Sequence, residues 1–287
     1  MKKILVPIDF SDCSRLAVDF ASNLARKVNG EIYLLYVLET EEPDTGLGSS
    51  GSWAGAEAVS TVPYMIGRLR RVKTEMENFI SENGLNTANI HDSAEVGVPY
   101  IKINEAAEKY NAEVIIMGTH GVSGMQKVLI GSVAEKVVQH ANIPVLTIKE
   151  RKTVNPTNII FASDFTEEAD NIFEKVRDFA AIYNAKIHLL NVADRDDENK
   201  NEKQHSLLRT FAIRHNAEDF PYHIFPAAKK EEGILLYSKE INADLIAIGT
   251  HGRSGLARFF NGSISVELVN HSFCPVLTVN FKDKSIT

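Results

Sequence analysis

Short aliphatic runs alternate with longer segments whose apolar residues recur at helical spacing along the whole chain. The short runs are rich in Val, Ile and Leu, and several are continuously apolar, as strands buried on both faces of a parallel sheet must be. The pattern predicts a strand, helix, strand, helix order. Predicted strands cover residues 4–8, 32–38, 90–96, 114–117 and 145–148, and then residues 158–162, 187–192, 222–225, 245–248 and 276–279.

Helix-start signals follow the first predicted strand of each half. Ser11 and Thr166 stand where the next helix needs an N-cap. Right-handed crossovers then place helices on both faces of a parallel sheet. We therefore predict an α/β protein with two tandem open parallel five-stranded sheets. Ligands of such sheets bind outside the carboxyl ends of the strands.

The chain contains the same unit twice. Shifted by 131 residues, residues 118–147 match residues 249–278 at 14 of 30 positions without a gap. Nearer the N-termini the shift is 155, so 155 − 131 = 24 extra residues lie in the first copy, and the Gly/Ser-rich stretch 40–58 is the candidate surface loop. We predict two domains, 1–150 and 151–287. Their last strands are expected to pair as edge strands in an intramolecular pseudo-dimer, and a further homodimer stays open.

Charge and cysteine usage narrow the class of protein. The formal net charge is 31 − 38 = −7, without a dense basic block, so nucleic acid is not an expected partner. The first apolar run is too short to span a membrane and lacks a cleavage region, which predicts a cytoplasmic protein. Cys13 and Cys274 are not equivalent in the repeat, and no HxxxH or CxxC spacing accompanies them, so neither a disulfide nor a metal site is expected.

Each copy carries a glycine-marked loop after its fourth strand, with the spacing Gly, two residues, Gly, nine residues, Gly-Ser. Glycine lets the backbone approach an anion, and the following helix start provides unpaired amides and a partial positive charge. Lys127 and Arg258, at matching positions, bring a cation to each loop. The loops therefore suit phosphate, although turn geometry alone is an alternative reason for the glycines. The positions are Gly118, Gly121, Gly131 and Ser132, and Gly249, Gly252, Gly262 and Ser263.

This spacing resembles that of the universal stress protein family, and the resemblance covers nearly all of both copies. It implies a Rossmann-like fold with five parallel strands, ATP as ligand with Mg²⁺ able to accompany it, and tandem members that fold as pseudo-dimers. The binding residues that the resemblance implies in the first copy are Asp9, Val37, Met117, Gly118, Gly121, Gly131, Ser132 and Val133, and those in the second are Asp164, Val192, Gly249, Gly252, Gly262, Ser263 and Ile264. The residues themselves add Pro7, His120 and Lys127 to the first set, and His251 and Arg258 to the second.

The second copy departs from the first around this predicted site. Ala162 replaces Pro7 and Ile248 replaces Met117, while Ala228 and Lys230 stand where the first copy has Gly97 and Pro99. These changes are expected to narrow or reshape the second pocket.

Catalysis is weakly indicated. Asp9 and Asp164 are single carboxylates without a visible partner for acid–base work, so ligand binding or helix capping is the favoured role. His120 and His251 lie in the turns, where they are either turn residues or proton donors beside a phosphate. The leading hypothesis is a stress-response sensor or regulatory module that binds an adenine nucleotide. The alternatives are a slow ATP hydrolase or phosphotransferase, and a scaffold with one degenerate site.

Overall fold

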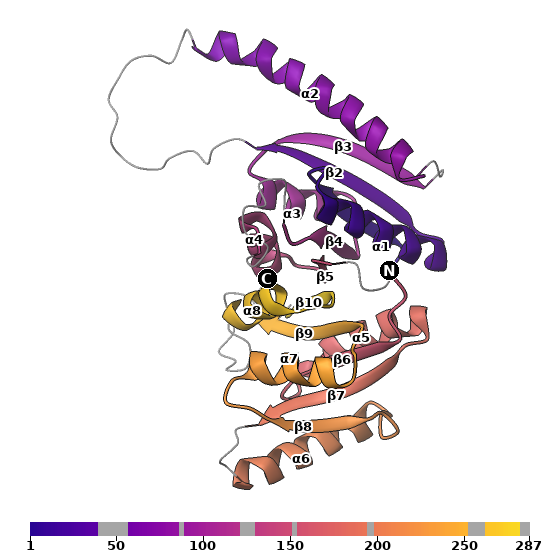
Figure 1. Ribbon diagram of the computed structural model, residues 1–287, viewed down its shortest axis with the longest axis vertical. Helices are drawn as coiled ribbons and strands as arrows, with labels where there is room; N and C mark the ends of the chain where they lie inside the picture. Colours follow the sequence, from indigo (N-terminus) through magenta and orange to yellow (C-terminus); the bar gives the residue numbers. More distant parts are fainter. Residues whose placement is uncertain are drawn as a thin grey trace, which may run out of the picture.

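The computed structural model describes residues 1–39, 57–85, 89–120, 130–150, 154–193, 198–251 and 262–281. Strands and helices alternate along the chain, and the two halves stack along the long axis of the molecule (Figure 1). The N-terminus and the last described strand, residues 276–281, lie near the middle of this axis, close to the junction of the halves.

The helices and strands occur where the hydrophobic pattern predicts them, and each strand end falls within three residues of its expected position. The first half contains β1 (Lys3–Ile8), α1 (Asp12–Val28), β2 (Glu31–Glu39), α2 (Glu57–Glu82), β3 (Ile90–Gly97), α3 (Pro99–Lys109), β4 (Val114–Gly118), α4 (Ser132–His140) and β5 (Val145–Ile148). The second contains β6 (Asn158–Ala162), α5 (Ala169–Tyr183), β7 (Lys186–Ala193), α6 (Glu198–Arg214), β8 (Tyr222–Pro226), α7 (Lys230–Glu240), β9 (Leu245–His251), α8 (Gly262–His271) and β10 (Val276–Phe281).

The strands form one ten-stranded sheet in the order β3-β2-β1-β4-β5-β10-β9-β6-β7-β8. Within each half the neighbours are parallel, which confirms the α/β class, and β5 pairs antiparallel with β10 where the halves meet. The two predicted five-stranded sheets are thus halves of a continuous sheet. Leu146 lies opposite Leu277 at the centre of the junction. Thr147 and Thr278 each donate a hydroxyl hydrogen bond of 3.2 Å to the partner strand's carbonyl.

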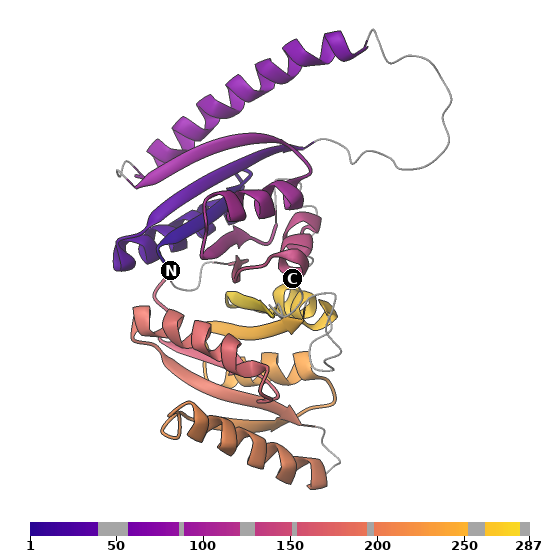
Figure 2. The same ribbon diagram turned by 180° about the vertical axis from the view of Figure 1, so that it is seen from behind.

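Alternation along the strands sends side chains to two cores, one on each face of the sheet. Ile4 and Val6 enter the core covered by α1, α2, α5 and α6, and Leu5 enters the core covered by α3, α4, α7 and α8. Each core contains residues of both halves. Figures 1 and 2 show the helices that cover the two faces of the sheet. The sheet is therefore buried on both faces, as its continuously apolar strands predict.

The two equivalent helices α1 and α5 begin differently. Ser11 caps α1, because its side chain accepts a hydrogen bond from the Ser14 amide. The expectation for Thr166 is wrong: its hydroxyl donates instead to Asp164 Oδ1 at 3.0 Å. Helix α5 begins only at Ala169, after an N-cap residue without a side-chain cap.

Both halves reverse direction sharply after their first strand. Phe10 and Phe165 follow the two aspartates with φ of 64° and 59°, in a left-handed region that costs non-glycine residues about 1 to 2 kcal/mol. Burial of the rings offsets this cost: Phe10 stacks on Tyr36 with 5.1 Å between centroids, and Phe165 is only 2% exposed. The turns leave Asp9 and Asp164 at the carboxyl edge of the sheet.

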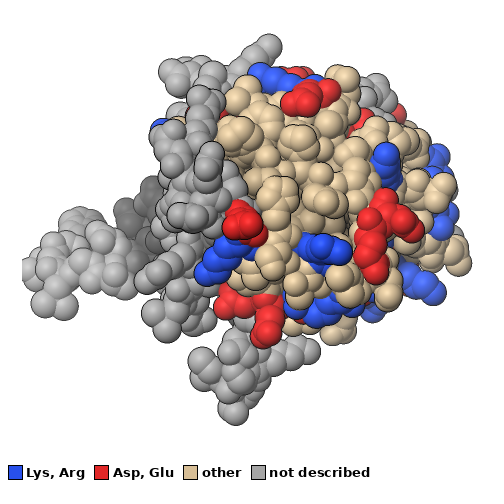
Figure 3. Space-filling view, turned by 90° about the horizontal axis from the view of Figure 1, so that it is seen from below, with Lys and Arg blue, Asp and Glu red and all other residues tan. Residues whose placement is uncertain are grey.

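Charged side chains of both signs surround an uncharged centre at the lower end of the molecule (Figure 3). In the second half two such pairs join residues one turn apart or on neighbouring helices, Arg177 with Glu174 and Arg214 with Asp170. Among the described residues, no helix combines the length and the apolarity that crossing a membrane requires.

The contact between Gly118 and α1 gives a first prediction. A Cβ at Gly118 would lie 2.6 Å from Cys13 Cβ and 2.8 Å from its carbonyl carbon, whereas a Cβ at Gly67 in α2 would meet nothing within 4 Å. We expect Gly118→Ala to destabilise the first half by about 1 to 3 kcal/mol through overpacking. Gly67→Ala, the matched control, should stabilise it by roughly 0.5 to 1 kcal/mol. Urea denaturation measures both; equal midpoints would contradict the prediction.

Candidate functional site

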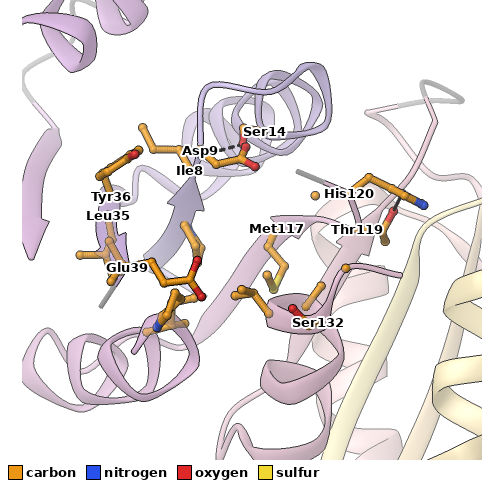
Figure 4. A pocket seen from close by; sticks show the side chains of 18 of the residues that line it. Ile8, Asp9, Ser14, Leu35, Tyr36, Glu39, Met117, Thr119, His120 and Ser132 are labelled. Atoms are coloured by element: carbon orange, nitrogen blue, oxygen red, sulfur yellow. Dashed lines mark hydrogen bonds between the residues drawn. The ribbon is translucent and has the colours of Figure 1, made fainter. Parts of the chain in front are cut away.

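A cavity of about 400 Å³ opens at the carboxyl edge of the first half of the sheet (Figure 4). This volume lies within the roughly 300 to 1,000 Å³ of small-molecule sites. In the view of Figure 4, Leu35, Tyr36 and Glu39 lie on one side of it, and Met117 and Ser132 on the other. Its apolar lining comes from Pro7, Ile8, Leu35, Val37, Pro99, Ile103 and Met117.

Asp9 is a fixed carboxylate in the cavity lining. Its Oδ1 accepts hydrogen bonds from the Ser14 hydroxyl at 2.5 Å and from the Ser11 amide at 3.1 Å. The Asp9 amide donates in turn to Ser14 Oγ at 3.0 Å. Both serines belong to the start of α1, so the residues that cap the helix also orient this carboxylate.

The N-terminus of α4 supplies the cavity with backbone donors. Its N-cap, Gly131, has no side-chain capping bond, and the first bond within the helix runs from the Glu135 amide to the Gly131 carbonyl at 3.0 Å. The amides of Ser132, Val133 and Ala134 therefore have no acceptor within the helix, and these residues line the cavity. An anion placed here meets three donors and the positive end of the helix dipole.

The structure revises the reasons given for two glycines. The amide of Gly131 donates to the Thr119 carbonyl at 2.7 Å, so it is not available to a phosphate. Gly118 lines the cavity, but the position of its missing Cβ faces Cys13 of α1, so close packing of helix on strand requires this glycine. Among the described residues, the donors come from the first turn of α4 and not from Gly131.

His120 lies where the chain leaves β4. Its ring nitrogen Nδ1 is 2.7 Å from Thr119 Oγ1, and its carbonyl accepts from the Ser11 hydroxyl at 3.3 Å. Figure 4 shows its side chain extending away from Tyr36 and Glu39, beyond Thr119. The neighbouring residue Thr119 thus holds the His120 ring in place.

Most of the predicted first-copy residues lie around this one cavity, namely Pro7, Asp9, Val37, Met117, Gly118, His120, Gly131, Ser132 and Val133. Four predicted positions, Gly121, Lys127, Gly252 and Arg258, lie outside the described residues. In the part of the chain that the structure describes, no group of three or more His, Cys, Asp or Glu side chains is arranged to hold a metal ion.

Sequence reasoning missed five polar residues of the cavity: Ser14, Tyr36, Glu39, Arg68 and Thr119. Ser14 and Thr119 had a local signal, because Ser14 lies in the first turn of the helix after Asp9 and Thr119 directly follows Gly118. Tyr36 and Glu39 lie one residue before and two residues after Val37 on β2. Arg68 comes from α2 and had no signal. Burial raises the pKa of the Tyr36 phenol, and the positive charge of Arg68 opposes that rise.

The second half is packed more tightly at the equivalent place. A Cβ at Gly233 of α7 would lie 2.6 Å from Val192 Cγ1, so α7 lies directly against the end of β7. Val192 is only 8% exposed, whereas its counterpart Val37 is partly exposed and lines the cavity. Position 102, the counterpart of Gly233, is a lysine.

Near the second aspartate, a lysine replaces an apolar residue of the first half. Lys230 begins α7 at the position that Pro99 holds in α3. Burial lowers the pKa of Lys230 to about 8, and the nearby Asp164 carboxylate opposes this shift. The other predicted residues of this half lie at the same edge: Gly249 and His251 end β9, and Gly262, Ser263 and Ile264 begin α8.

The sequence profile of the universal stress protein family matches residues 1–149 and again residues 156–280. The chain belongs to this family. Universal stress protein MJ0531 of Methanocaldococcus jannaschii is 39% identical over 153 residues, covering 53% of this chain and 84% of that protein. Universal stress protein Slr1230 of Synechocystis is 23% identical over 291 residues, covering 97% of this chain and 99% of that protein.

Two solved structures superpose on both halves of this chain. The crystal structure of a universal stress protein from Archaeoglobus fulgidus superposes with a TM-score of 0.70 at 25% identity, covering 97% of this chain and 98% of that one. A structure from Pseudomonas aeruginosa superposes with a TM-score of 0.72 at 17% identity, covering 98% of this chain and 93% of that one, a likeness of fold alone. The fold is therefore that of a tandem universal stress protein.

The interaction of Lys230 with Asp164 gives the second prediction. Asp164→Asn removes the negative charge that favours the ammonium form, so the pKa of Lys230 should fall below about 8. Amine labelling across pH, read by mass spectrometry, should then begin at a lower pH for Lys230. The exposed neighbour Lys229 is the control in the same spectra. A labelling midpoint of Lys230 that stays or rises would show that Asp164 does not act on it.

Proposed function

We propose that this universal stress protein binds an adenine nucleotide, ATP in the first instance, in the first-domain cavity, and acts as a cytoplasmic stress-response sensor or regulatory module. One observation carries the proposal: the cavity combines an apolar lining with the N-terminus of α4, which has no side-chain cap. A ligand that suits both features has a flat, mainly apolar group joined to an anion, as a nucleotide has.

The lining residues support an assignment of roles. Met117, Ile103 and Val37 are suited to the faces of an adenine ring, and Asp9 to a hydrogen bond from its polar edge. The phosphates then meet the amides of Ser132, Val133 and Ala134. Arg68, also in the lining, provides a positive charge. Mg²⁺, where present, would be held mainly by phosphate and water.

We propose that the first site is the stronger of the two. In the second half, Val192 is packed against α7, and the ammonium of Lys230 stands where the first half has a proline ring. Both differences oppose an adenine ring at that place. The second-copy residues remain a proposed weaker site, and its anion-binding end is the start of α8.

The pairing of β5 with β10 supports the view that the halves act as an intramolecular pseudo-dimer, with domains 1–150 and 151–287. That pairing uses the edge that each half would otherwise expose. Whether two such chains associate further is measured by light scattering after size-exclusion chromatography.

Nucleotide binding is tested at Ser132, the first residue of α4. Ser132→Asp puts a negative charge at the helix start, which should stabilise α4 by about 0.3 to 1 kcal/mol and repel a phosphate. We expect calorimetry to show ATP and ADP binding to the wild type, with and without Mg²⁺. The variant should lose at least about tenfold in ATP affinity, equal to roughly 1.4 kcal/mol, and keep its affinity for adenosine.

Two controls accompany this substitution. Ser132→Ala removes the hydroxyl without adding charge and should bind ATP nearly as the wild type does. Ser263→Asp makes the matched change in the second half and should leave the stronger binding event unchanged. A wild-type protein that binds neither ATP nor ADP would refute the proposed function.

A slow ATP hydrolase or phosphotransferase is the competing function, and His120 and His251 are its candidate proton donors. The ring of His120 is held by Thr119 at the cavity edge, which favours a role in turn structure. We therefore expect His120→Ala to retain ATP binding, and steady-state turnover of the wild type to stay near the level of buffer. Turnover well above buffer that His120→Ala abolishes would establish the enzyme instead.

A further inference from the structure

The second half reaches the N-terminus of α4 through one buried side chain. Asn270 of α8 is 5% exposed, and its Oδ1 accepts a hydrogen bond of 2.5 Å from the Ile130 amide. Ile130 directly precedes Gly131, the N-cap of α4. A backbone amide can only donate, so the amide oxygen of Asn270 must face it.

The other end of α4 is also held by the second half. Asn280 Nδ2, in β10, donates to the carbonyl of Ala141, the C-cap of α4, and to that of Val138 at 3.3 Å. The first half makes the equivalent contact with α8. Lys149, the counterpart of Asn280, donates a hydrogen bond of 2.7 Å from its ammonium group to the Asn270 carbonyl, near the end of α8. The contacts at the helix C-termini are therefore reciprocal.

The contact at the N-terminus of α4 comes from one half only in the described residues. The counterpart of Asn270 in α4 is Gln139, an exposed residue whose amide donates to Glu135 of its own helix at 3.2 Å. Asn270 thus adds to the reciprocal contacts a bond directed at the start of α4, where the first-domain cavity has its backbone donors.

We propose that Asn270 is a positioning residue through which the second domain sets the geometry of the anion-binding end of the first-domain site, and through which occupancy of that site reaches the second domain. The inference rests on the proposed nucleotide function. Its physical basis is a short path: Asn270 fixes Ile130, and the next amide, that of Gly131, fixes the chain to the Thr119 carbonyl. Ile130 and Thr119 are thereby both fixed relative to the start of α4.

The coupling runs in both directions. An anion that pulls on the first turn of α4 shifts the amide that Asn270 holds, and α4 packs on α8. By thermodynamic linkage, if a shift of α8 changes the affinity for the anion by some factor, anion binding changes the equilibrium of that shift by the same factor. The second domain is in this way a regulator of the first site even when its own site is empty.

The test replaces Asn270 by leucine, which is similar in size but has no acceptor, in the full chain. Removing the bond should speed hydrogen exchange of the Ile130 amide by about tenfold. ATP affinity should fall by roughly tenfold, within the 5- to 150-fold range typical of coupled sites, while adenosine affinity stays within twofold. Gln139→Leu is the matched control and should change none of these. Asn270→Asp keeps an acceptor oxygen and should retain slow exchange at Ile130.

The possible outcomes separate this inference from the proposed function. Exchange at Ile130 that is unchanged in Asn270→Leu, or as fast in Asn270→Asp, overturns it. Equal losses of ATP and adenosine affinity also overturn it, because they indicate a general structural role. A wild type that binds no nucleotide refutes the proposed function, whereas nucleotide binding that Asn270→Leu leaves intact refutes only the inference.

Discussion

Antiparallel pairing of β5 with β10 is the constraint on which the rest of this molecule depends. Each half ends in a short apolar strand at the edge of its sheet, and an unpaired edge exposes a row of backbone donors and acceptors. Pairing two such edges removes both at once and continues the sheet across the junction. The same pairing brings α4 and α8 together, which allows side chains of one half to reach the helix ends of the other.

The fold was predictable because the same order of apolar strands and amphipathic helices occurs twice in the sequence. Continuous apolar runs such as residues 114–117 and 245–248 are typical of strands buried in a covered parallel sheet. Their repetition at one offset predicted two copies of the same unit. Strand ends were less certain, since β9 extends three residues past its predicted end into His251. Thr166 was misjudged because its hydroxyl has two local partners available, a helix amide or a carboxylate, and sequence alone does not rank them.

The site was predictable in position and only partly in chemistry. Carboxyl ends of parallel strands must meet at one edge, which placed Asp9, Val37 and Met117 together. What each glycine does depends on which direction its missing Cβ would face, and this is a property of helix packing that the spacing of glycines does not contain. Arg68 reaches the cavity from α2, after residues 40–56, so no local pattern could place it there.

Duplication followed by divergence explains why the two halves differ where they do. The residues that keep the sheet together, from Pro144 to Thr147 and from Pro275 to Thr278, are identical in both copies, because a change in one strand must be matched in the other. Around the two sites the copies agree only in part: the loop glycines match, whereas Ala162 and Ile248 replace Pro7 and Met117. Gly233 brings α7 against Val192, and Lys230 places a charge beside Asp164, while Asn270 turns its amide toward the first half. A tandem chain can thus keep identical strands at its junction while the surroundings of its two sites differ.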